Sequence, residues 1–136
     1  MKRDAITRFL AEKALGWELS SWREIEPTEL TYGGSTNNLD GTYRCWIDKR
    51  GNKAMREVDF DPFTNIAHAF LVVEALEEKG IVIDLSFDAH EYLASFWNLT
   101  TEETVASATS SKAPEAITLA ATRALATPEQ LKGFGL

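Results

Sequence analysis

Apolar residues recur at helical spacing near the start of the chain. Ile6, Leu10 and Ala14 lie four residues apart and place one apolar stripe on a helix over residues 4–15. Asp4 is positioned to cap the free amides at the start of this helix. The pattern therefore predicts an N-terminal amphipathic helix.

The second helical pattern begins near Asp61, which we expect to be the N-cap, with Pro62 at the first helical position. Gly80 is expected to end this helix. His68 lies at the flank of the stripe, where a boundary histidine making one hydrogen bond is expected. The predicted stripe consists of Phe63, Ile66, Phe70, Val73 and Leu76.

Alternating patterns predict strands on either side of that helix. Residues 42–48 and 53–58 are expected to form a hairpin that turns at Gly51. Residues 81–87, 92–99 and 104–110 are expected to form three further strands. In the hairpin, one face is expected to carry Tyr43, Cys45 and Ile47, and the other Thr42, Arg44, Trp46 and Asp48.

Pro114 is expected to open a last helix, with Ile117 and Ala121 facing inward. Residues 17–40 are expected to form a long connection with a short strand, which Trp22 and Tyr32 would anchor to the body of the domain. The order is helix, hairpin, helix, three strands and helix. Short antiparallel connections make this an α+β fold, an antiparallel sheet with helices packed on it. A single domain over residues 1–136 is expected.

The cysteine content and the apolar runs indicate the cellular compartment. Cys45 is the one cysteine, which excludes an internal disulfide and favours a reducing compartment. No apolar run follows the charged first residues, and the longest apolar run is far shorter than a membrane span. We therefore expect a cytoplasmic protein.

The net charge of −7 argues against a general nucleic-acid coat, but the charge is uneven. Residues 44–56 hold five basic residues and one acid, a local charge of +4. An exposed Trp46 ring beside cations would suit a nucleotide or a single strand. A solvated hairpin face is the simpler alternative, and core packing is the simpler role for the tryptophan. The candidate ligand-binding residues are Arg44, Trp46, Lys49, Arg50, Lys53 and Arg56.

Other residues offer weaker chemistry. Asp84, Asp88 and His90 could supply carboxylates and an imidazole for a divalent metal. However, four residues along a strand separate the two carboxylates by about 13 Å at about 3.3 Å per residue, which one ion cannot bridge. Cys45 has apolar neighbours that suggest a buried thiol. No catalytic residue, metal site or cofactor is expected.

Three stretches carry a resemblance to a known family: residues 3–7 leading to Trp17, residues 61–70, and residues 113–117. Together they are similar to the phage ABA sandwich domain family, the middle stretch most specifically. The resemblance implies a bacteriophage or prophage protein with an α/β/α layered fold, which would act in the cytoplasm of a bacterial host cell. The family supplies no established catalytic residues, so none is transferred.

The leading hypothesis is a small phage accessory protein that acts by binding, without catalysis. A host protein or a small nucleotide is the expected partner, and a homodimer is one expected form. One alternative is a nucleic-acid-binding module that uses the basic hairpin over residues 44–56. A second alternative is a metal-dependent hydrolase that uses Asp84, Asp88 and His90.

Overall fold

The computed structural model describes residues 1–23 and 42–136. The chain divides into two compact units: residues 1–16 with 60–136, here the core unit, and residues 17–59, here the ribbon unit. Single-domain organisation stays a prediction. The expected anchoring role of Tyr32 lies outside the described residues.

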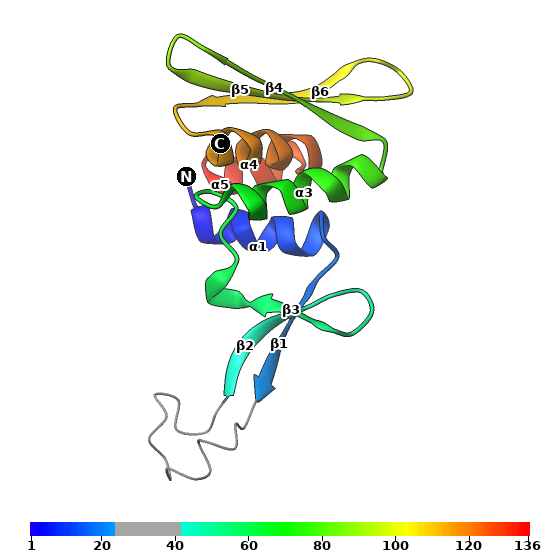
Figure 1. The fold of residues 1–136 in the computed structure, drawn as a ribbon, viewed down its shortest axis with the longest axis vertical. Helices are drawn as coiled ribbons and strands as arrows, with labels where there is room; N and C mark the ends of the chain where they lie inside the picture. The colour runs from blue at the N-terminus through cyan, green and yellow to red at the C-terminus, as the bar shows by residue number, and fades with distance from the viewer. Residues whose placement is uncertain (24–41) are drawn as a thin grey trace. The chain divides into compact units, whose positions relative to one another are not determined.

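The core unit contains four helices and one sheet (Figure 1). In chain order its elements are α1 (Arg3–Lys13), α3 (Ile66–Glu78), β4 (Ile81–Asp88), β5 (Glu91–Asn98), β6 (Thr104–Ser110), α4 (Ala113–Leu125) and α5 (Pro128–Phe134).

The sheet of the core unit is antiparallel in the order β4-β5-β6. Ile83 lies opposite Phe96, and Phe96 lies opposite Ala106. A bulge follows, because the register shifts between Phe96 and Trp97. The three predicted strands and the alternation of faces along β4 are therefore confirmed.

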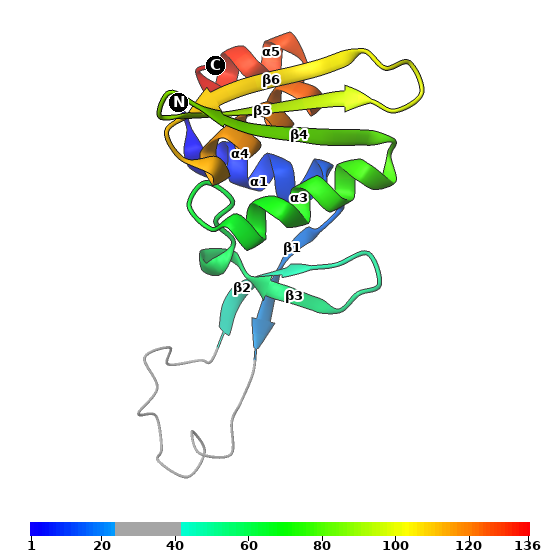
Figure 2. The same cartoon turned by 45° about the horizontal axis from the view of Figure 1, so that its top comes forward.

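Helix α4 is the centre of the core unit. It contacts β5 and β6, and also α1 and α3; Figure 2 shows it beneath the sheet. Residues 116–122 are consequently all buried. Its alanines let neighbouring elements approach closely, while Thr118 and Thr122 satisfy their buried hydroxyls by donating to the carbonyls of Pro62 and Thr118, at 2.8 and 2.7 Å.

Helix α3 begins four residues later than the sequence predicted. Asn65, not Asp61, is its N-cap, and the Asn65 side chain accepts hydrogen bonds from the backbone N–H groups of Ala67 and His68. Asp61 instead accepts the Asn65 N–H in a preceding turn. The prediction of Asp61 as the cap is wrong because the Asp61–Asn65 turn intervenes.

The apolar stripe of α3 is also displaced. Ile66 and Phe70, which were predicted to be inside, are 44% and 38% exposed. The residues that α3 buries are Ala69, Val72, Val73 and Leu76. Packing on α4 and β4 selects this neighbouring stripe, so the prediction is wrong at Ile66 and Phe70. It is correct at Val73 and Leu76, and Phe63 is also buried, although it precedes the helix.

Helix α1 buries Ile6, Leu10 and Ala14 as predicted. Its N-cap is Lys2, which makes no side-chain capping bond, so the capping role predicted for Asp4 is wrong. Helix α4 begins at Ala113, with Pro114 in its first turn as predicted, but it is not the last helix, because α5 follows it.

The ribbon unit is an antiparallel sheet in the order β1-β2-β3. Its elements are β1 (Glu18–Arg23), β2 (Thr42–Ile47), β3 (Lys53–Arg56) and the 3-10 turn η1 (Glu57–Asp59). Gly51 takes a φ of 84° in the β2–β3 turn, where a side chain would be strained. Asp48 Oδ1 accepts the N–H groups of Arg50 and Asn52 and closes that turn.

The predicted hairpin and the short strand after Trp17 are confirmed, although the second hairpin strand ends at Arg56. Within residues 1–23 and 42–136, four helices with two three-stranded antiparallel sheets confirm the α+β class with helices packed on an antiparallel sheet.

Candidate functional site

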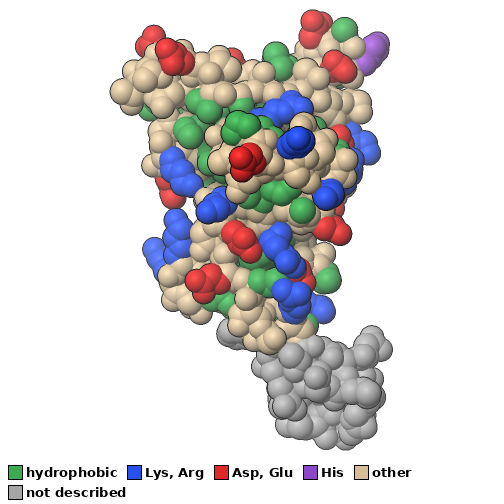
Figure 3. Space-filling view, turned by 180° about the vertical axis from the view of Figure 1, so that it is seen from behind, with side chains coloured by type: hydrophobic (Ala, Val, Ile, Leu, Met, Phe, Trp, Pro, Cys, Tyr) green, Lys and Arg blue, Asp and Glu red, His purple; other side chains and the backbone are tan. Residues whose placement is uncertain are grey.

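The ribbon unit carries most of the basic residues that the sequence singled out, and Figure 3 shows several Lys and Arg side chains there. Antiparallel pairing decides which of these side chains can meet. In β2, consecutive residues point to opposite faces, so Tyr43 and Arg44 are separated by the strand.

Trp46 is not available to a ligand. Its side chain is only 1% exposed, and its ring lies 6.5 Å from that of Trp17, tilted by 39°. Its indole N–H has no hydrogen-bond partner among the described residues. The expectation of an exposed stacking ring at Trp46 is therefore wrong, and core packing, the alternative, is what the structure shows.

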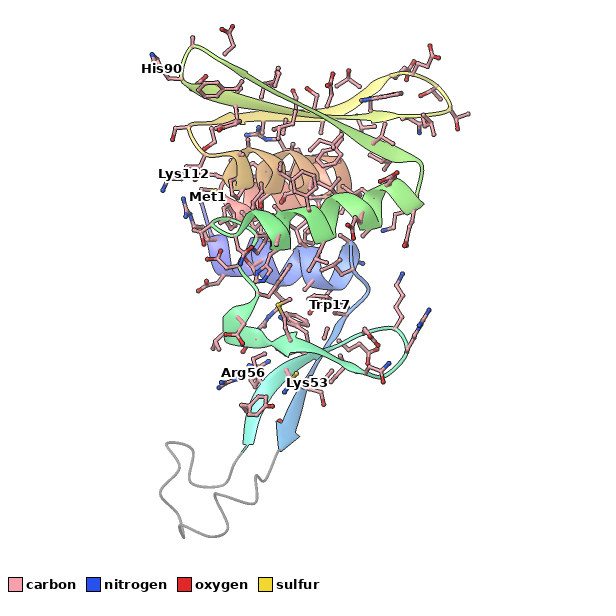
Figure 4. All side chains as sticks on the ribbon, viewed as in Figure 1. Met1, Trp17, Lys53, Arg56, His90 and Lys112 are labelled. Carbon is pink, nitrogen blue, oxygen red and sulfur yellow. The ribbon has the colours of Figure 1, made fainter. Side chains whose placement is uncertain are left out.

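Tyr43, and not Trp46, is the aromatic residue that contacts the cations of the hairpin. The Arg56 guanidinium carbon lies 4.6 Å from the centre of the Tyr43 ring, and Lys53 Nζ lies 5.0 Å from it. Lys53 Nζ also donates a 2.6 Å hydrogen bond to the Tyr43 hydroxyl. We name these three residues the tyrosine cluster; Figure 4 labels its two cations.

Cross-strand register builds the tyrosine cluster. Arg56 lies opposite Cys45, and Lys53 lies opposite Ile47. Both partners share the face of Tyr43 in β2, because they are two and four residues further along the strand. An irregularity between Trp46 and Ile47 lets Lys53 and Arg56, three residues apart, lie on one face.

The other predicted binding residues do not join the cluster. Arg44 lies on the opposite face, with its Nε 3.7 Å from a carboxylate oxygen of Glu57. Lys49 and Arg50 are exposed in the turn after β2. Of the six predicted residues, the structure brings together Lys53 and Arg56, and it adds Tyr43.

Tyr43 was missed because the alternating pattern grouped it with Cys45 and Ile47 on an apolar face. Cys45 is buried as predicted. The signal that could have found Tyr43 is the register of the hairpin, which places Arg56 opposite Cys45 and therefore diagonal to Tyr43.

His68 lies on α3 and is half-buried. Its Nδ1 accepts the backbone N–H of Asp61 at 3.0 Å, and its ring lies 5.7 Å from that of Phe60. The prediction of a boundary histidine with one hydrogen bond is confirmed. The geometry assigns His68 to holding the turn before α3.

Within residues 1–23 and 42–136, no group of three or more His, Cys, Asp or Glu side chains is close enough together to hold a metal ion. Asp84, Asp88 and His90 therefore do not converge as the hydrolase alternative requires. His90 lies at the tip of the β4–β5 hairpin (Figure 4).

The fold and the site together define a class: an α+β protein with a helical core under one antiparallel sheet and a basic, tyrosine-bearing β-ribbon. The phage ABA sandwich domain matches residues 8–122, and the chain belongs to that family. Neither curated proteins nor solved structures gave a match. In the described part of the chain, every helix is too short or too polar to cross a bilayer.

Proposed function

We propose that this phage protein binds a small nucleotide through the tyrosine cluster and does not turn it over. The observation that carries the proposal is the geometry of Tyr43, whose ring centre lies within 5.0 Å of both the Lys53 ammonium and the Arg56 guanidinium carbon. An aromatic ring that holds two cations offers phosphate recognition and base stacking in one place.

Each residue of the tyrosine cluster has a distinct role. Arg56 presents a planar fork of donors that matches a phosphate, and stacking on Tyr43 holds this fork in one orientation. Lys53, fixed by the Tyr43 hydroxyl, adds a second point charge. The ordering of the two cations before binding lowers the entropy that a ligand must overcome.

The candidate catalytic side chains of the protein are not available for a reaction, which favours binding without catalysis. Cys45, the nearest potential nucleophile on the same strand, is fully buried. The half-buried His68 belongs to the core unit, where its Nδ1 already accepts a backbone N–H. A bound nucleotide would thus be sequestered, which is how a small phage protein could withhold it from the host.

The test is calorimetric titration of the full chain with ATP, ADP, AMP and pyrophosphate, with released phosphate measured in parallel. Arg56→Ala should weaken the binding of the preferred nucleotide at least about tenfold, or about 1.4 kcal/mol. Arg44→Ala is the matched control, because it removes an arginine from the other face of β2, and it should leave affinity within about twofold.

Equal losses in Arg56→Ala and Arg44→Ala would show only a diffuse charge effect and refute the site. If none of these ligands binds at concentrations up to about 1 mM, the proposal that the protein binds a nucleotide is refuted. Steady release of phosphate would refute the non-catalytic assignment.

A further inference from the structure

The sheet of the core unit has two unlike faces. The face toward the helices buries Ala94, Phe96 and Ala108, and α3 and α4 contact the sheet there. In Figures 1 and 2 the helices of the core unit all lie on this side of the sheet. We name the other side the open face.

The open face carries large apolar side chains among small polar ones. Val82 lies opposite Trp97, and Val105 is the extra residue of the bulge beside Trp97. Leu93 and Val105 are each 41% exposed. The strand alternation fills the remainder of this face with Asp84, Ser86, Ser95, Ser107 and Thr109.

The charged residues of the sheet strands and of the turns between them have one sign. Residues 81–110 contain five carboxylates and no lysine or arginine. Figure 3 shows acidic side chains at both ends of the sheet. Asp84 lies on the open face, Asp88 and Glu91 lie opposite each other at one end, and Glu102 and Glu103 lie in the β5–β6 turn at the other.

A second copy of the chain is a poor occupant of the open face. Two such faces would bring five carboxylates against five, and like charges across an interface are strongly unfavourable. Pairing through the β6 edge is also hindered, because Arg123 of α4 donates to the Ser107 carbonyl at 3.1 Å. Charge complementarity therefore points to a cationic partner.

The dimensions of the face select the shape of that partner. Eight residues of strand extend about 27 Å, the length of about 18 residues of α-helix. Three strands about 4.8 Å apart match a helix about 10 Å wide. Helices already pack on the other side of the same strands, so the sheet can accept one on each face.

We propose that the open face binds a cationic amphipathic helix of a partner protein, with apolar residues on Trp97 and Leu93 and basic residues against the carboxylates at the two ends. This surface is independent of the tyrosine cluster, and either proposal can fail without the other. The partner would be recognised by a leucine- and lysine-bearing helix face, about 18 residues long.

The probe is a synthetic amphipathic peptide of leucine and lysine, about 18 residues long, with a leucine and glutamate peptide of the same pattern as its control. Amide shifts of the labelled full chain would map the binding. We expect the lysine peptide to shift Leu93, Ser95, Trp97 and Ser107, and the glutamate peptide to shift none of them.

Matched variants distinguish binding at the open face from nonspecific binding of the peptide elsewhere on the protein. Leu93→Ser should weaken binding of the lysine peptide at least about fivefold. Ile66→Ser on α3 should leave binding unchanged, although the Ile66 side chain is exposed to a similar degree. The double change Asp88→Asn with Glu91→Gln should weaken binding of the lysine peptide. The control double change on α3, Glu77→Gln with Glu78→Gln, should leave this binding unchanged.

Three outcomes would overturn the proposal: no shifts at millimolar lysine peptide, shifts centred on α3, or equal binding of the glutamate peptide. A dimer in light scattering that Leu93→Ser converts to a monomer would also overturn it and assign the open face to a second copy. Because Leu93 is exposed, a folded variant is expected, and unchanged far-UV circular dichroism verifies this.

Discussion

The backbone N–H of Asp61 donates a hydrogen bond to Nδ1 of His68, with a distance of 3.0 Å between the two nitrogens. The bond secures the segment that leads into α3, where the Asp61 carbonyl in turn accepts the Asn65 N–H. His68 thus has the structural role that its position at the flank of the predicted stripe indicated.

Replacing His68 should test that role. His68→Leu replaces the imidazole by an apolar side chain of similar size and leaves the Asp61 N–H without its acceptor, so it should cost about 1 kcal/mol of stability. His68→Asn, whose side-chain oxygen can accept the same N–H, should cost less. Urea denaturation of the two variants would measure the difference; equal losses would show that the hydrogen bond contributes nothing.

Asn65 caps α3 by accepting two backbone N–H groups. Asn65→Ala should therefore lower the free energy of unfolding by about 1 kcal/mol, while Asn65→Asp, which keeps the acceptor, should be close to neutral. Thermal unfolding would rank them. A loss in Asn65→Asp as large as in Asn65→Ala would contradict the capping role.

Thr118 supplies the hydroxyl that satisfies the Pro62 carbonyl in the interior. Thr118→Val preserves shape but leaves that carbonyl unpaired, so we expect a loss of about 1–3 kcal/mol. Thr122→Val is the control, because its hydroxyl donates to a carbonyl four residues earlier in the same helix, an optional bond. Chemical denaturation should show the larger loss for Thr118→Val, and the reverse order would refute the assignment.

Arg123 covers a carbonyl on the free edge of β6. Arg123→Ala should expose this edge and raise concentration-dependent self-association, measured by light scattering, relative to Lys132→Ala, which removes an exposed charge from α5. If both variants stay at the mass of the parent protein at every concentration, Arg123 has no protective role.

Salt dependence distinguishes the nucleotide from the nucleic-acid alternative. A nucleotide held by Lys53 and Arg56 replaces few counterions, so its affinity should fall only modestly between about 50 and 200 mM salt. A single strand that also used Lys49, Arg50 and Arg44 would lose affinity more steeply. Fluorescence anisotropy of a labelled oligonucleotide beside calorimetry of the nucleotide would show which is bound; tighter and steeper oligonucleotide binding would favour the alternative.

Local patterns were enough for much of the fold. The three strands of the core sheet follow from alternation, and the hairpin from Gly51, because both depend on neighbours in the chain. The family resemblance rested on other local segments, residues 3–17, 61–70 and 113–117, and membership is confirmed over residues 8–122.

Tertiary packing decided what periodicity alone could not. Ile66 and Phe70 form as good a stripe as the residues that α3 buries, and only contact with α4 and β4 selects between them. Trp46 is buried and Tyr43 meets the cations because cross-strand register, not spacing along the chain, determines which side chains become neighbours. The sequence by itself determined most of the elements and their order, although it did not predict the helix α5. The pairing of distant segments decided which faces are covered, since burial depends on what packs against each face.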